Sequence, residues 1–256
     1  MKWYIEKFVN MSLAQLWQLL SKPWKISAAL TAPPPSSSKN AIQSLFPDQT
    51  PESIEAYRSE FIGNHRFFAE LNKKLVEKRG TRTCCGGWKD FIYMAVRLKK
   101  PGIIIETGVF DGLSTAVFLQ ALHDNKDGFL ISVDLPATKT IVGSTHRMYA
   151  TTLPHDYRPG WVIPDYLRER HRLVLGDSKI ILPKLFREYP KIDIFFHDSL
   201  HTFEHMYFEY STAWPHLSEG GLLFSDDIFW SEAFHKFCRE NRRKYLRIKG
   251  LGAVRK

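Results

Sequence analysis

Three carboxylates and a histidine follow two apolar runs in the second half of the chain. Asp198 and His201 come directly after residues 192–196, and Asp226-Asp227 comes after residues 222–225. Parallel strands end at the same edge of a sheet, so the three carboxylates are expected to converge there. Carboxylates that meet repel one another unless a cation neutralises them, and their oxygens suit Mg²⁺ or a similar divalent ion. We therefore predict Asp198, Asp226 and Asp227 as metal ligands, with Asp198 also acting in catalysis on a metal-held hydroxyl.

His201 is the predicted general base. It follows Asp198 by three residues, at the start of the next predicted helix, within reach of a hydroxyl that the metal polarises. A structural histidine is the plainer alternative. A zinc site of His197, His201 and His205 is disfavoured, because His197 adjoins a buried strand and no cysteine or HExxH pattern accompanies the histidines.

A glycine-containing turn follows the first apolar run of the main domain. The run 103–105 leads into Glu106-Thr107-Gly108, then Gly112 and a predicted helix that starts near Ser114. Gly108 lets the backbone turn, and Gly112 permits close approach of a ligand. The next apolar run ends in Asp134, where a carboxylate is placed to bind ribose hydroxyls. We predict that Asp134 and this loop, Ser114 included, bind a nucleoside-type cofactor.

The pattern of the loop favours S-adenosylmethionine over a dinucleotide. The dinucleotide fingerprint GxGxxG cradles a pyrophosphate, whereas this loop reads ExGxxxG and lacks the middle glycine. S-adenosylmethionine has no phosphate, and its cationic amino and sulfonium groups suit the acidic Glu106 and Asp111. A glycine turn without any ligand is disfavoured, because Asp134 and the strand pattern agree with a cofactor site.

A third turn, Gly176-Asp177-Ser178, follows the run 172–175. In a sheet of this kind the turn lies beside the adenine, so we predict that Asp177 and Ser178 bind the cofactor. Either residue also suits a helix N-cap, and the two roles are compatible.

Short apolar strands alternate with amphipathic helices from residue 88 onwards. This alternation predicts an α/β fold, a Rossmann-like, doubly wound, mostly parallel sheet of seven strands. Strands are expected over residues 103–105, 129–133, 172–175, 192–196, 222–225, 245–249 and 253–255, and helices over residues 88–99, 114–123, 178–188, 202–217 and 232–241.

Three segments together resemble a known family. The runs IIETGVFDGLSTAVFLQAL, GDSKIILPKL and HDSLHTFEHMYFEYSTAWPHLSEGGLLFSDDI resemble class I methyltransferases of the macrolide-sugar O-methyltransferase and cephalosporin-hydroxylase-like group, over about residues 88–230. The resemblance implies magnesium ligands at Asp198, Asp226 and Asp227 and a base at His201. Catechol O-methyltransferases carry Lys at the position of His201 and Asn at that of Asp227, so these residues favour a hydroxyl of a sugar, glycoside or related small metabolite as acceptor.

The first 40 residues differ from the rest. Residues 3–24 carry apolar side chains at helical spacing, and residues 31–38 form a Pro/Ser linker. We predict an N-terminal extension over residues 1–40 and a methyltransferase domain over 41–256. The helical lead-in of this domain spans 41–100 and includes a helix-prone stretch over residues 51–78. The amphipathic helix is expected to pack on the domain or on a second subunit, with peripheral membrane contact as the alternative.

Charge and cysteine content limit the partners. The chain has a net charge of +9, and residues 236–256 hold nine Lys and Arg against one Glu, or +8. No RNA-binding signature or zinc-finger spacing accompanies this run, so nucleic acid is not expected. The three cysteines form no disulfide pattern, which favours a reduced, cytoplasmic protein. Acceptor choice is assigned to residues 138–166, where Trp161 and Tyr166 either line a pocket or pack, and a homo-oligomer remains open.

Overall fold

The computed structural model describes residues 32–84, 86–135, 153 and 157–256. The helix expected over residues 3–24 and most of the acceptor stretch 138–166 lie outside these residues.

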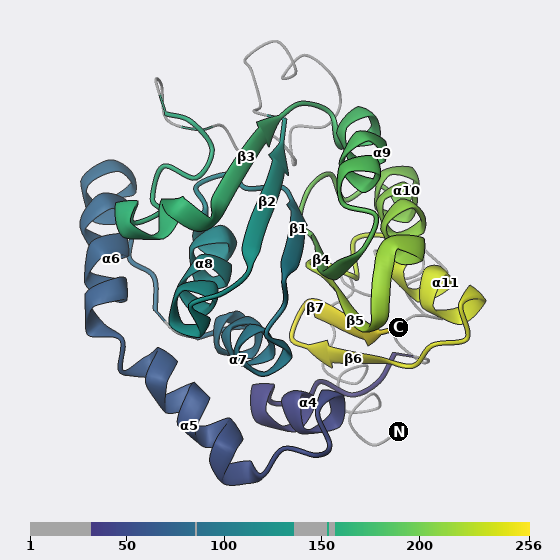
Figure 1. The fold of residues 1–256 in the computed structure, drawn as a ribbon, viewed down its shortest axis with the longest axis horizontal. Coiled ribbons are helices and arrows are strands. Elements are labelled where there is room, and N and C mark those ends of the chain that lie inside the picture. Colours follow the sequence, from purple (N-terminus) through teal and green to yellow (C-terminus); the bar gives the residue numbers. More distant parts are fainter. Residues whose placement is uncertain (1–31, 85, 136–152, 154–156) are drawn as a thin grey trace, which may run out of the picture.

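A seven-stranded sheet forms the centre of the molecule, in the order β3-β2-β1-β4-β5-β7-β6 (Figure 1). The first five strands run parallel, and β7 pairs antiparallel with both β5 and β6. This is the Rossmann-like sheet that the sequence predicts. The strands are β1 Ile103–Thr107, β2 Phe129–Asp134, β3 His171–Leu175, β4 Ile192–His197, β5 Leu217–Ser225, β6 Tyr245–Ile248 and β7 Leu251–Arg255.

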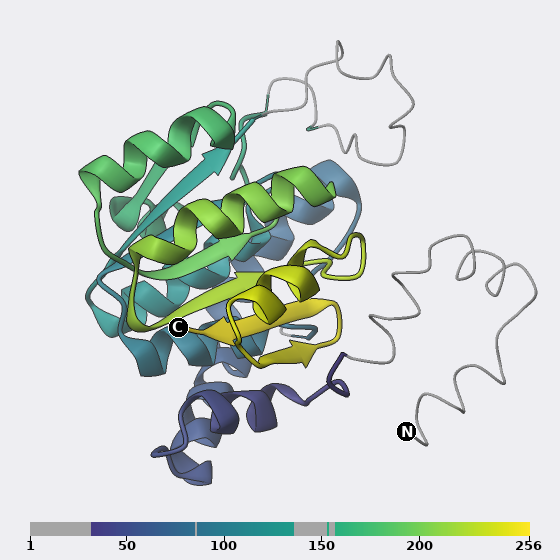
Figure 2. The ribbon, with the colours of Figure 1, turned by 90° about the vertical axis from the view of Figure 1, so that its right-hand side faces the viewer.

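Helices cover both faces of the sheet (Figure 2). One hydrophobic core lies between the sheet and α4 to α8, and a second lies beneath α9 to α11. The helices are α4 Ser38–Leu45, α5 Pro51–Ile62, α6 His65–Arg79, α7 Lys89–Lys99, α8 Leu113–Asn125, α9 Ser178–Glu188, α10 Phe203–Ala213 and α11 Ala233–Glu240, with 3₁₀ turns η2 Asp165–Arg170 and η3 Trp214–His216.

Two helical stretches end differently from the prediction. Residues 51–78 divide into α5 and α6, because Gly63 ends the first helix and the Asn64 side chain caps the second by accepting from the Phe67 N–H. The helix expected over 202–217 ends at Ala213 and passes through η3 into β5. Pro215 has no N–H to continue an α-helix, which explains the early end.

The described part of the Pro/Ser linker is anchored to the sheet. The Ser36 N–H donates to the Arg247 carbonyl at 2.7 Å, and the Ser37 side chain caps α4. Helix α4 buries Ala41, Ile42 and Leu45 in the core. The chain therefore joins the domain before residue 41.

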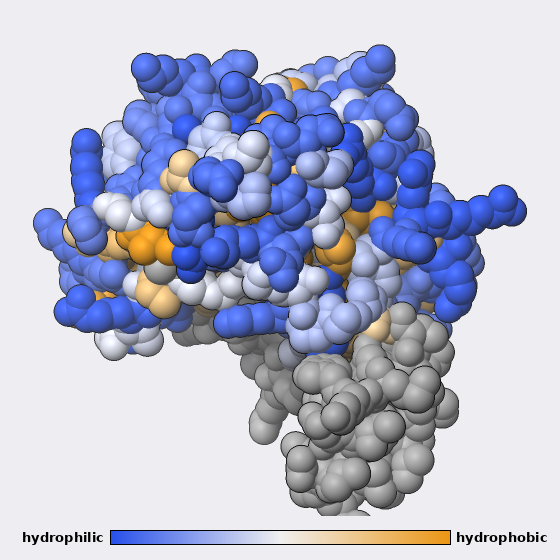
Figure 3. Space-filling view, turned by 90° about the horizontal axis from the view of Figure 1, so that it is seen from below, coloured by the Kyte–Doolittle hydropathy of each residue, from blue (hydrophilic) through white to orange (hydrophobic). Residues whose placement is uncertain are grey.

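The face in Figure 3 is largely polar, with small, separate hydrophobic areas. Within the described part of the chain, no helix is both long and apolar enough to cross a bilayer.

Candidate active site

The carboxyl ends of β1, β4 and β5 meet at one rim. Thr107 pairs with His197, and His197 pairs with Ser225, so the residues that follow these strands are neighbours. The Asp198 N–H donates to the Thr107 carbonyl at 2.8 Å, and the Asp226 N–H donates to the His197 carbonyl at 2.9 Å. The rim therefore places the predicted cofactor loop beside the predicted acidic residues.

Both glycines of the loop are required by close contacts. Gly108 has a φ of +83°, and a Cβ there would overlap the backbone carbonyl of Asp198. Gly112 has a φ of +97°, and a Cβ there would lie 2.6 Å from the Cα of Gly160. Glycine lets the loop approach the end of β4 at one point and Gly160, in the described part of the acceptor stretch, at the other.

Asp134 braces the loop from the end of β2. Its Oδ2 accepts from the backbone N–H groups of Val109, at 2.7 Å, and Phe110, at 3.0 Å. The Asp134 carboxylate thus holds the glycine turn in place beside the predicted ribose-binding position.

Glu106 is fully buried behind the loop. Its carboxylate accepts from the hydroxyls of Ser114, Thr115 and Ser132 at 2.6–2.7 Å. Burial raises the pKa of Glu106 to about 7, and the three hydroxyls oppose the rise. Glu106 and Ser114 therefore hydrogen-bond to each other, and the Glu106 carboxylate joins β1 and β2 to α8.

Asp111 has a cationic partner within the protein. Its carboxylate forms two hydrogen bonds with Arg79 at the end of α6, at 2.7 and 3.1 Å, and accepts from Trp161 Nε1 at 2.7 Å. The expectation that Asp111 offers its charge to a cationic ligand does not match this geometry. Trp161 packs on the loop, and Tyr166 donates to the Gln120 side chain.

Thr107 and Ser178 direct their hydroxyls towards α10. Thr107 Oγ1 donates to Glu209 Oε2 at 2.5 Å, and Ser178 Oγ lies 3.0 Å from His205 Nε2. Asp177 is the N-cap of α9 and accepts from the Lys179 N–H. The residues that the sequence assigns to the cofactor thus include several with structural hydrogen bonds of their own.

Asp198, Asp226 and Asp227 form an acidic group at the rim. The pKa of Asp198 is raised well above its ordinary value by loss of solvent and by repulsion from Asp226, Glu106 and Asp227. Partial burial and Asp227 raise the pKa of Asp226 to about 6. The pKa of Asp227 is also raised, mainly by burial, while Trp230 opposes the rise.

The donor chemistry of this group fits a hard divalent cation, because carboxylates that raise one another's pKa gain from a positive charge between them. The side chains are not gathered around one point, however. Among the described residues, no three His, Cys, Asp or Glu side chains are placed to hold a metal ion.

His201 lies beside Asp198, with 3.8 Å between its Nε2 and Asp198 Oδ1. Burial and the neighbouring His197 lower the pKa of His201 to about 3. The imidazole is therefore neutral near pH 7, which is the form that accepts a proton. The ring also packs near the half-exposed Trp230, with 5.9 Å between ring centroids.

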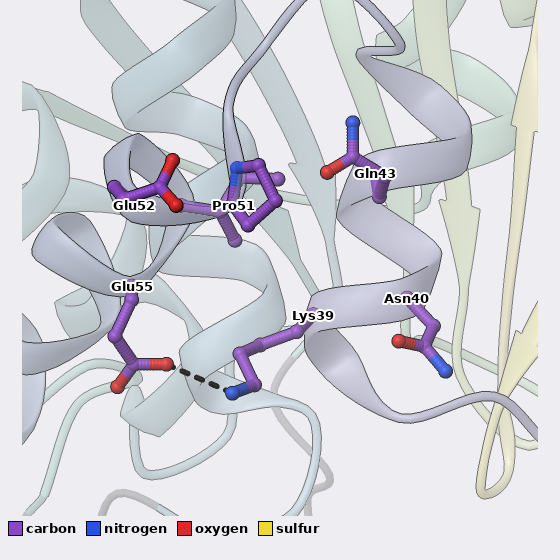
Figure 4. Close-up of a pocket in the computed structure, with 7 residues that line it drawn as sticks. Lys39, Asn40, Gln43, Pro51, Glu52 and Glu55 are labelled. Atoms are coloured by element: carbon purple, nitrogen blue, oxygen red, sulfur yellow. Dashed lines mark ion pairs between the residues drawn. The ribbon is translucent and has the colours of Figure 1, made fainter.

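A separate hollow lies between α4 and α5 (Figure 4). Lys39 and Glu55 form an ion pair across it at 2.9 Å, and none of the rim residues contributes to its lining. It therefore belongs to the packing of the helical lead-in.

Comparisons with known proteins match the part of the chain that forms this rim. Residues 105–228, which run from within β1 to just past β5 and include the acidic group, match a family model described as a methyltransferase domain. Over these residues the chain resembles a methyltransferase domain. No curated protein sequence matches the chain significantly.

Solved methyltransferase structures share the fold of this chain. An O-methyltransferase from Bacillus cereus in complex with SAH is 15% identical, with a TM-score of 0.52 over 79% of this chain and 100% of that chain. The O-methyltransferase TomG from Streptomyces achromogenes, in complex with SAM, is 14% identical, with a TM-score of 0.50 over 79% of this chain and 96% of that chain.

Sequence reasoning missed several partners at this site. Glu209, Thr115, Ser132 and Arg79 bond to residues of the methyltransferase domain that lie 9–102 positions away. Thr115 lies on the predicted helix after the glycine turn, so helical spacing was a usable signal for it. The others had no local signal, because their partners come from other elements.

Proposed function

We propose that this methyltransferase transfers the methyl group of S-adenosylmethionine to a hydroxyl of a sugar, glycoside or related small metabolite. The observation that carries the proposal is the close approach of Gly108, in the loop after β1, to the backbone of Asp198. This approach places the proposed donor site next to the acidic group. Methyl transfer is an in-line displacement, so holding donor and acceptor at this rim supplies much of the rate.

The donor side is proposed to comprise Glu106, Thr107, Gly108, Gly112, Ser114, Asp134, Asp177 and Ser178. Asp134 uses Oδ2 for the loop, which leaves Oδ1 to accept from a ribose hydroxyl. Glu106 and Ser114 act from behind by fixing the ends of β1 and α8. The O-methyltransferase names of the structural relatives favour oxygen as the acceptor atom.

The acceptor side is proposed to comprise Asp198, Asp226, Asp227 and His201. The three carboxylates would hold a divalent cation, which supplies positive charge that lowers the pKa of an acceptor hydroxyl. Neutral His201, whose Nε2 lies 3.8 Å from Asp198 Oδ1, takes the proton of that hydroxyl. Burial is the main cause of the raised pKa values of Asp198 and Asp226, and the repulsion that adds to it would be relieved by a cation, which supports the proposal.

Isothermal titration with S-adenosylmethionine tests the donor site. We expect one molecule bound per chain, and Asp134→Asn lowers the affinity about tenfold because a charged hydrogen-bond acceptor becomes neutral. Absence of heat at millimolar donor contradicts the proposal.

Titration with Mn²⁺ in the absence of donor and acceptor tests the cation. We expect binding by the wild type and its loss in Asp198→Asn, while the control Asp127→Asn, at an exposed turn, binds as the wild type does. Equal binding by all three proteins removes the cation from the mechanism. Methyl transfer to a panel of glycosides that continues unchanged in EDTA favours the metal-independent alternative, in which the acidic group shapes the acceptor pocket.

We also propose that the enzyme acts in the cytoplasm. The described thiols Cys84 and Cys238 are unpaired, which suits a reducing compartment. Recovery of the intact chain with its thiols reduced from the cytosolic fraction is expected, and recovery from an extracellular fraction contradicts it.

A further inference from the structure

Glu209 lies at the centre of a buried polar cluster beneath the rim. It is on α10, its side chain is fully buried, and four side-chain donors surround its carboxylate. Oε2 accepts from Thr107 at 2.5 Å and lies 2.6 Å from His197 Nδ1, while Oε1 accepts from Ser199 at 2.9 Å and lies 2.9 Å from His205 Nε2. A carboxylate offers about four acceptor positions, so this one is saturated.

The protonation of the cluster follows from the charge of Glu209. Burial acts to raise its pKa, but His197 and His205 outweigh burial and hold the pKa well below the ordinary value. An ionised carboxylate only accepts hydrogen bonds, so His197 Nδ1 and His205 Nε2 must both carry hydrogen. Their tautomers are thereby fixed by Glu209.

The four donors come from parts of the chain that must stay in register during methyl transfer. Thr107 ends β1 and leads into the donor loop, and His197 ends β4 immediately before Asp198. Ser199 lies in the segment between Asp198 and His201, and His205 contacts Ser178 at the start of α9. One carboxylate thus joins the donor side of the rim to the segment that carries both proposed catalytic side chains.

Fold stability alone does not account for such a group. A buried ionised carboxylate loses its hydration, and well-packed apolar residues in place of a buried ion pair are often as stable or more so. The Glu209 carboxylate instead orients its neighbours, because each hydrogen bond fixes the position of one donor side chain.

We propose that Glu209 is a positioning residue that couples the donor site to the segment 198–202. The coupling rests on the proposed function, since it assumes that S-adenosylmethionine binds at the loop after β1. S-adenosylmethionine bound at this loop reduces the mobility of Thr107 and Ser178. Through their contacts with Glu209 and His205, this also reduces the mobility of Ser199 and of the nearby Asp198 and His201.

Hydrogen exchange of the full chain tests the coupling, with S-adenosylhomocysteine as the probe. In the wild type, saturating probe slows exchange of the amides of residues 198–202. In Glu209→Gln these amides exchange at least about tenfold faster without probe, and probe no longer slows them although calorimetry shows that it binds. The amides of α8 exchange as in the wild type, which separates a local effect from general destabilisation.

Glu204→Gln is the matched control, because it makes the same change at an exposed position of the same helix. It should retain the wild-type rates and the slowing by probe. If Glu209→Gln does not fold, Ser199→Ala decides, since it removes one donor and should abolish most of the slowing. Slowing by probe that persists in folded Glu209→Gln or in Ser199→Ala overturns the coupling, whereas a wild type that binds no probe overturns the proposed function instead.

Discussion

Gly108 sets the distance between the donor loop and the acidic segment. Its φ of +83° and the carbonyl of Asp198 next to it leave no room for a side chain. The carboxyl ends of β1 and β4 can therefore lie this close together only because residue 108 has no Cβ.

We expect Gly108→Ala to weaken S-adenosylhomocysteine binding at least about tenfold and to lower the free energy of unfolding by roughly 1–3 kcal/mol, since strain and overlap combine. Gly80→Ala is the control, because Gly80 has a similar φ of +63° with nothing within 4 Å of its Cβ position. It should show a smaller loss of stability, from strain alone, and normal binding. Calorimetry and urea unfolding measure both quantities, and equal effects of the two changes contradict the role of the contact.

Glu106 links stability to pH. Its pKa rises from 4.5 to about 7 on folding because the carboxyl is buried, so between these values the folded protein holds a proton that the unfolded chain releases. The contribution of Glu106 to stability is therefore largest below about pH 4.5 and is lost as the pH rises to about 7.

Glu106→Gln has no carboxyl to titrate, so we expect its unfolding free energy to fall less than that of the wild type between pH 5 and pH 7.5. Urea titrations at several pH values give the difference between the two proteins. Parallel curves across this range contradict a raised pKa at Glu106.

Helix α6 reaches the donor loop through its last residue. Arg79 pairs with Asp111, whose side chain is only 10% exposed, and the Arg79 guanidinium also lies over the Phe110 ring at 4.9 Å from its centroid. The helical lead-in therefore contacts the donor loop through Arg79.

Replacing Arg79 by Met leaves the Asp111 charge without this partner, so we expect stability to fall by about 1–3 kcal/mol and donor affinity to fall with it. Lys73→Met removes a cation from an exposed position of the same helix and should change either quantity little. Thermal unfolding with and without donor product tests the pair. A loss for Lys73→Met as large as for Arg79→Met shows that helix charge matters rather than the contact.

At the scale of the molecule, positive charge gathers at the end of the chain. Arg239, Arg242, Arg243 and Lys244 are all exposed around the end of α11. Arg247, on the strand that follows, accepts the N–H of Ser36, where the described chain begins to join the domain. A cationic area next to the N-terminal extension favours contact with an anionic lipid surface.

We expect the full chain to sediment with vesicles that contain phosphatidylserine, and less so at high salt. Reversal of Arg242, Arg243 and Lys244 to Glu should reduce this binding, while reversal of the exposed Lys73, Lys184 and Arg187 changes net charge equally and should reduce it less. Equal losses in the two triple variants mean that net charge, and not this area, determines binding.

Local sequence determined the elements and the residues at their ends. Apolar runs of three to five residues followed by Glu106-Thr107-Gly108, Asp134 and Asp198 predicted β1, β2 and β4 nearly to their bounds. The reason is that burial between two helical layers demands continuous apolar strands, which a sequence shows directly. Helix ends were harder to predict from the sequence. In α10 the apolar periodicity continues beyond Ala213, where the helix ends ahead of Pro215.

Only the tertiary structure decided what the polar side chains of the rim bond to. Glu209 lies 102 residues from Thr107, and Asp111 lies 32 residues from Arg79, so no local pattern relates the partners. A buried charge takes whichever donors the packed elements bring to it, and these depend on sheet order and helix rotation. The sequence thus placed acidic residues at the rim, and packing determined which of them face a ligand and which hold the rim together.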